Sequence, residues 1–107
     1  NGSDDDDDAK PVLTIDTGIA AGGQYTQINL TVDNTLFRQT ISVNDVHLGG
    51  ALMSLDLNDV TRINPREVIL HVNGTVYKDI SDMAVVTVSA NATESNMELK
   101  ASRIVSD

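Results

Sequence analysis

The chain contains no cysteine and no tryptophan, and its 107 residues include only two prolines, two tyrosines and one phenylalanine. Without cysteine, neither a disulfide framework nor a thiolate metal site can form. The shortage of aromatic residues requires an aliphatic core, and it argues against a carbohydrate-binding module, which would need exposed Trp or Tyr platforms. No stretch approaches the ~18 apolar residues of a membrane span.

Basic residues are also scarce, because 7 Lys and Arg stand against 16 Asp and Glu, a formal net charge of −9. An acidic surface repels phosphate backbones, so we expect no nucleic-acid partner. Five of the acids form the run Asp4–Asp8, where no turn would converge the carboxylates on Ca²⁺. We therefore interpret residues 1–10 as a disordered acidic tail or linker, and residues 11–107 as one domain.

Alternation of apolar and polar residues dominates the rest of the chain. In residues 24–34, Ile28, Leu30 and Val32 alternate with polar residues, which is typical of a strand with one buried and one wet face. Similar patterns predict strands at the following segments: 11–16, 38–48 (with a β-bulge at Asn44-Asp45 or a break into two strands), 53–57, 68–72, 84–90 and 97–105. Residues 51–63 could also be read as a helix, but their alternation favours a strand.

This spacing of strands predicts an all-β protein, an immunoglobulin-like antiparallel β-sandwich of about seven strands. We expect turns at Gly22-Gly23, from Asn58-Asp59 to Pro65 and at Asn73-Gly74, and a crossing loop over residues 74–82 anchored by Val76 and Ile80. The predicted shared core consists of these residues: Ile28, Leu30, Val32, Val43, Leu70, Val72, Val86 and Val88.

No residue pattern predicts a reaction centre. The two histidines, His47 and His71, lie in predicted strands without a metal-binding motif. The serines show no nucleophile elbow, and the candidate paired carboxylates Asp56, Asp59 and Asp79 read as solvated turn residues. We predict no catalytic, cofactor-binding or metal-binding residue, and no enzyme activity.

Three sequons are candidate N-glycosylation sites: Asn29-Leu-Thr, Asn73-Gly-Thr and Asn91-Ala-Thr. A fourth, Asn1-Gly-Ser, lies in the tail. The alternative is that these triplets are ordinary turn and strand composition in a chain rich in Asn and Thr.

The order of the segments resembles the extracellular β-sandwich domains of archaeal pilin-like proteins, including the archaellum accessory type (FlaF and FlaG). The likeness rests on residues 22–34, on Ile-Ser-Val-Asn-Asp-Val at 41–46 and on Ile63-Asn64-Pro65, and it covers residues 11–105. The chain departs from the pattern of these domains at Arg66, where such turns commonly have Gly, and in lacking the N-terminal membrane helix.

The resemblance implies an extracytoplasmic domain of the cell envelope that docks onto surface-layer protein or a filament subunit. We would then expect membrane attachment only through an N-terminal helix that is missing here. The alternative is a capsid decoration or fibre protein of a virus or phage, which is also a small binding protein.

The last predicted strand is our candidate for a binding edge, because it carries charges but no proline. An edge strand offers unpaired backbone groups to a second chain. The candidate interface residues for a protein partner or a homodimer are Met97, Leu99, Ser102 and Arg103.

Overall fold

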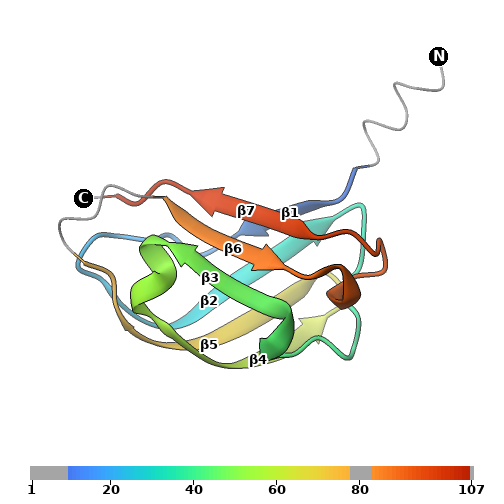
Figure 1. Ribbon diagram of the computed structural model, residues 1–107, viewed down its shortest axis with the longest axis horizontal. Coiled ribbons are helices and arrows are strands. Elements are labelled where there is room, and N and C mark those ends of the chain that lie inside the picture. The colour runs from blue at the N-terminus through green and yellow to red at the C-terminus, as the bar shows by residue number, and fades with distance from the viewer. Residues whose placement is uncertain (1–9, 78–82, 107) are drawn as a thin grey trace, which may run out of the picture.

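Two antiparallel sheets pack face to face in the computed structural model, which describes residues 10–77 and 83–106 (Figure 1). One sheet has four strands in the order β1-β2-β5-β4 and the other has three in the order β3-β6-β7. This is the strand order of a seven-stranded immunoglobulin constant-type sandwich. The predicted fold class is confirmed.

The strands are joined by loops and three short 3₁₀ turns. Their bounds are β1 (Val12–Ile15), β2 (Gln24–Asp33), η1 (Val43–Asp45), β3 (Val46–Gly50), η2 (Ala51–Ser54), β4 (Asp56–Asn64), β5 (Glu67–Thr75), β6 (Ala84–Val88), η3 (Ala90–Ala92) and β7 (Leu99–Arg103).

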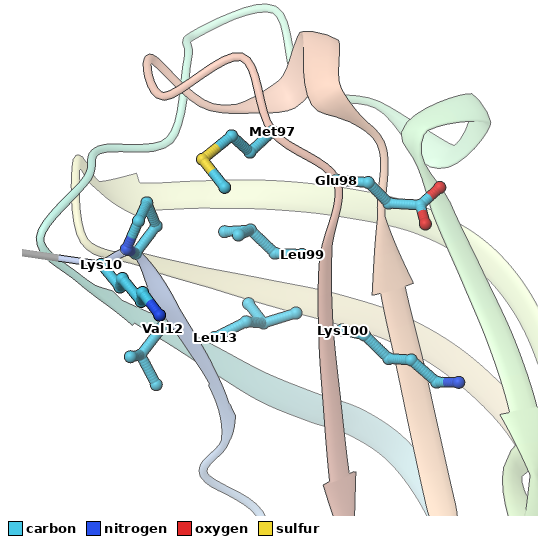
Figure 2. Close-up of a pocket in the computed structure, with 8 residues that line it drawn as sticks. Lys10, Val12, Leu13, Met97, Glu98, Leu99 and Lys100 are labelled. Atoms are coloured by element: carbon cyan, nitrogen blue, oxygen red, sulfur yellow. The ribbon is translucent and has the colours of Figure 1, made fainter. Parts of the chain in front are cut away.

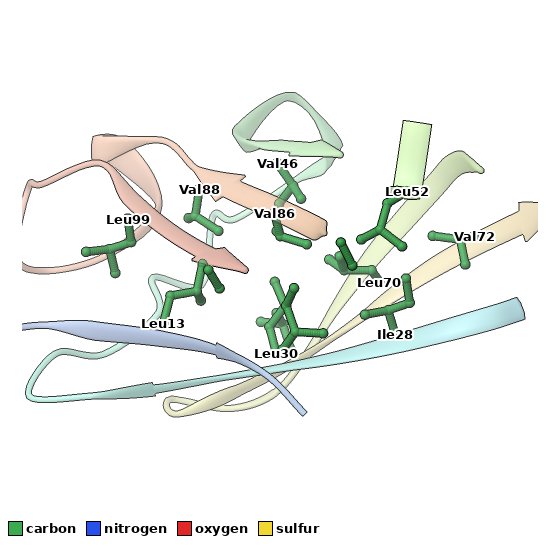
Figure 3. Close-up of a cluster of buried hydrophobic side chains, with 14 of the residues drawn as sticks. Leu13, Ile28, Leu30, Val46, Leu52, Leu70, Val72, Val86, Val88 and Leu99 are labelled. Atoms are coloured by element: carbon green, nitrogen blue, oxygen red, sulfur yellow. The ribbon is translucent and has the colours of Figure 1, made fainter. Parts of the chain in front are cut away.

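Alternate side chains of both sheets fill one aliphatic core (Figure 3). Ile28, Leu30 and Leu70 of the larger sheet and Val86 and Val88 of the smaller one have no exposed surface. Seven of the eight predicted core residues are buried. The exception is Val43, which lies in η1 and is only partly buried.

The prediction for 38–48, either one bulged strand or two short strands, was wrong except for its last three residues. Residues 38–42 form no strand, η1 follows them, and β3 begins only at Val46. The switch in parity between Val43 and Val46 therefore marks a 3₁₀ turn rather than a bulge. The Asp45 carboxylate stabilises this turn by accepting hydrogen bonds from Ser42 N at 3.1 Å and from Ser89 Oγ at 3.0 Å.

The fourth strand lies later in the chain than predicted. Residues 51–54 form η2, and β4 runs through the expected turn at Asn58-Asp59. A register shift against β5 between Leu57 and Asp59 accommodates these polar residues within the strand. Neither the helix over 51–63 nor the strand over 53–57 is present as predicted.

The Asn73-Gly74 pair is not a turn but part of β5, which extends to Thr75. Pairing on both sides overrides the local preference, since Thr75 lies opposite Gln24 and Asn73 lies opposite Asp56. Gly74 has φ 144°, and a Cβ there would come within 2.9 Å of Ser54 O. Val76 is fully buried as expected, whereas Ile80 lies outside the described residues.

The loop before β2 is held by the ring of Tyr25. Its hydroxyl accepts a hydrogen bond from Ala20 N at 2.7 Å. The ring lies so close over Gly23 that a Cβ at this position would be 2.9 Å from it. The Gly22-Gly23 pair therefore allows a turn with the ring folded back over it, as the sequence predicted.

We expect Leu30→Ala to lower the free energy of unfolding by about 2–5 kcal/mol, because it removes a fully buried side chain and leaves a cavity between the sheets. Denaturant unfolding followed by circular dichroism measures the change. The matched control is Gln27→Ala on the exposed face of the same strand, for which we expect a change within about 0.5 kcal/mol. Equal stabilities of the two variants would contradict the core described here.

Candidate docking surfaces at the strand edges

Each sheet ends in two outer strands, β1 and β4 in the larger sheet and β3 and β7 in the smaller. An outer strand presents a row of backbone groups that no neighbouring strand pairs, and a second chain can bind there. The four edges of this domain differ in how they are covered.

The β1 and β7 edges lie side by side and close one side of the sandwich (Figure 1). At one end of this seam, Arg103 Nη1 donates a hydrogen bond to Ile15 O at 3.1 Å. Beyond it, Ser106 N donates to Ile19 O at 3.0 Å, and Ala21 N donates to Ser106 O at 2.8 Å. The seam is thus fastened along its C-terminal part.

The other end of the seam opens into a groove of about 410 Å³, which lies between residues 10–13 and 97–100. Figure 2 shows Leu13, Leu99 and Met97 between β1 and β7, whereas Glu98 and Lys100 point to the opposite side of β7. Val12 and Met97 are about half exposed, at 48% and 51%. The groove therefore has an apolar lining, and the charged side chains of Glu98 and Lys100 lie on the far side of β7 from it.

Backbone groups from both strands point into this seam. Asp16 N donates to Asn29 O. In an antiparallel ladder alternate residues direct their peptide groups at the neighbouring strand, so Leu13, three residues before Asp16, directs its peptide groups away from β2. The paired residues of β6 and β7 include Val88 with Leu99 and Val86 with Ala101. Ser89 N donates to Asp45 O on the β3 side, so by alternation the peptide groups of Val88 and Val86 point towards β7. Their partners Leu99 and Ala101 therefore direct their peptide groups at β6, and the peptide groups of Lys100, which lies between these two, point away from β6.

The β4 edge is blunted. Its register against β5 shifts between Leu57 and Asp59 and again between Arg62 and Asn64. Asp59 Oδ1 also accepts a hydrogen bond from Val60 N at 2.8 Å. Bulges and charged side chains of this kind prevent a flat pairing with another strand.

The β3 edge has no such protection. Its five residues, Val46–Gly50, include no proline, no acid and no Lys or Arg, and they pair with β6 without a shift of register. Ser89 N donates to Asp45 O and Ala51 N donates to Met83 O. These two bonds show that the odd-numbered residues from Asp45 to Ala51 direct their peptide groups at β6. The peptide groups of Leu48 therefore point away from β6, towards the outside of the sheet.

The four candidate interface residues do not form one exposed edge. Met97 precedes β7 and lines the groove, whereas Leu99 is only 6% exposed and belongs to the core. Ser102 and Arg103 are exposed, but they lie along the part of β7 that β1 and the Arg103–Ile15 bond cover. The sequence pattern identified β7 as an outer strand but carried no sign that β1 lies against it.

The three inner sequons differ in accessibility. Asn73 and Thr75 are both exposed at the end of β5. Asn91 is exposed in η3, but Thr93 of its sequon is fully buried, with its hydroxyl 2.8 Å from Ser95 Oγ. Asn29 is partly buried in the middle of β2, and its side-chain Nδ2 lies 3.5 Å from Glu67 Oε2.

The histidines and carboxylates are dispersed. His47 is exposed on β3, and His71 lies on the outer face of the other sheet, where its Nε2 is 2.8 Å from Thr61 Oγ1. Asp56 and Asp59 are exposed. Among residues 10–77 and 83–106, no group of three or more His, Cys, Asp or Glu side chains could hold a metal ion.

The described part of the chain contains no helix long and apolar enough to cross a membrane. Searches against protein-family models, curated proteins and solved structures find no match to this chain. The resemblance to archaellum accessory proteins and the docking role that it implies therefore stay predictions.

Among the three sequons that lie in the described residues, we expect glycan occupancy on the folded chain to be highest at Asn73, because it is the one whose asparagine and threonine are both exposed. Peptide mass spectrometry of the protein from a host with N-glycosylation measures the occupancy of each site. Thr75→Ala should abolish the Asn73 modification and serves as the control. Occupancy at Asn29 equal to that at Asn73 would contradict this ranking.

Proposed function

We propose that this chain is a non-catalytic extracellular docking domain that binds an extended segment of a protein partner in the groove between β1 and β7. The observation that carries this proposal is the groove itself, where two strand edges meet around the half-exposed Met97 and the buried Leu13 and Leu99. Its volume of about 410 Å³ lies within the usual range for binding sites, about 300–1,000 Å³.

The chemistry of the groove favours a polypeptide with aliphatic side chains. Met97, which is about half exposed, offers an apolar surface for such side chains, and the buried Leu13 and Leu99 lie beside it between the two strands. The peptide groups of Leu13 and Lys100 offer hydrogen bonds to the backbone of an extended segment, as in strand addition.

The partner class follows from the resemblance stated above. It would be a surface-layer protein or a filament subunit of the cell envelope, bound by a domain of the archaellum accessory type. A binding role of this kind requires no turnover of a substrate.

Met97→Asp should weaken binding to purified surface-layer protein or filament subunit by about tenfold or more, because it places a charge in the apolar groove. Bio-layer interferometry with the immobilised domain measures the affinity. Thermal unfolding of the variant should be nearly unchanged, since Met97 is half exposed.

The matched control is Met53→Asp, which makes the same change at an exposed methionine in η2. Its affinity should equal that of the wild type. Equal losses in both variants would show that added charge rather than the groove matters. No binding of either partner by the wild-type domain would overturn the proposal.

A further inference from the structure

We infer that two copies of this chain associate by pairing their β3 strands antiparallel, so that the two three-stranded sheets join into one continuous sheet. This surface is separate from the groove, because β3 and β7 are opposite edges of the sheet. The inference therefore stands or falls independently of the proposed function. The occupant is a second copy rather than another protein for three reasons: the charge of the surface, its fit to itself and the apolar side chains beside it.

The distribution of charge selects this surface for self-association. The strands β3, β6 and β7 contain no Asp or Glu, whereas they include Lys100 and Arg103. The four-stranded sheet has acids in β2, β4 and β5. Two copies of a chain with a net charge of −9 repel each other, and this repulsion is weaker at a strand that itself carries no carboxylate.

The sequence of β3 is complementary to itself. The peptide groups of Leu48 point outward, so Leu48 of each copy can exchange both backbone hydrogen bonds with Leu48 of the other. This register places the exposed side chain of His47 opposite Gly49 of the second copy, where no side chain competes for the space. It also places Val46 opposite Gly50. A twofold axis through Leu48 is therefore sterically allowed on the outer face.

Apolar side chains of the outer strands β3 and β4 are left partly exposed in a single copy. Leu48, Leu57 and Val60 pack against the core but remain only partly buried. Leu48 belongs to the outer strand of one sheet, and the other two belong to the outer strand of the other sheet. A second β3 would place its own Leu48 against this Leu48 on the core side, and apolar surface would leave water.

The absence of cysteine allows a direct test by single-cysteine cross-linking. In the register above, the Cα atoms of the two Leu48 residues are about 5.5 Å apart, within the range of about 4.4–6.8 Å that a disulfide spans. We expect Leu48→Cys to form a disulfide-linked dimer under mild oxidation at high chain concentration. The dimer should separate on reduction.

Two cysteine variants serve as controls. His47→Cys lies one residue away but points to the other face, where its nearest counterpart is a diagonal neighbour beyond disulfide reach. Met97→Cys lies in the groove at the opposite edge. We expect both to cross-link at least about tenfold more slowly than Leu48→Cys. Equal rates at Met97→Cys and Leu48→Cys would overturn the inference.

Sedimentation equilibrium of the protein without cysteine gives a second measurement that does not depend on Leu48→Cys folding normally. A junction of five residues from each chain is small, so we expect a weak dimer at high micromolar to millimolar concentrations. A wild type that stays monomeric at these concentrations would overturn the inference. His47→Glu should raise the dissociation constant by about tenfold, and Gln27→Glu, which adds the same charge to the other sheet, should leave it unchanged.

Discussion

The domain depends on the face-to-face packing of two alternating sheets around a core with almost no aromatic residues. No disulfide supplements this contact, and Phe37 is the one aromatic residue among the buried core residues that the structure describes. Each strand can contribute only if its apolar positions keep one parity, because a shift by one residue would turn its aliphatic side chains to water. Leu30 and Val86, both fully buried on facing sheets, illustrate how tightly register and stability are linked.

A sandwich of this kind necessarily has four outer strands, and this chain covers them unequally. The β1 and β7 edges cover each other, and Arg103 fastens them at one end. Two bulges and the Asp59 side chain blunt β4. Among the strand edges of the described residues, the open end of the β1–β7 seam and the whole of β3 remain as sites for another polypeptide. Both candidate binding surfaces therefore result from the same packing of two sheets that forms the core.

The sequence predicted the fold class and most of the core because period-two alternation directly reports which residues face the interior. It failed where local signals conflicted with long-range pairing. The Asn73-Gly74 pair has strong turn chemistry, yet strands on both sides hold it extended. The parity switch before Val46 has the same appearance whether a bulge or a 3₁₀ turn causes it. The groove was not predictable at all, because it joins residues 10–13 to residues 97–100, and no motif connects segments so far apart in the chain.

The protection of the remaining edges determines what kind of assembly the β3 strand can form. Pairing of two β3 strands about a twofold axis uses the same edge of both copies, so the contact closes on itself. Growth into a fibre would need a second flat edge on each copy. The β7 edge is covered by β1, and the β4 edge carries bulges and exposed carboxylates that oppose the approach of another acidic chain. The unprotected strand is therefore compatible with the proposed closed dimer, whereas the bulges and charges of β4 oppose growth into a fibre.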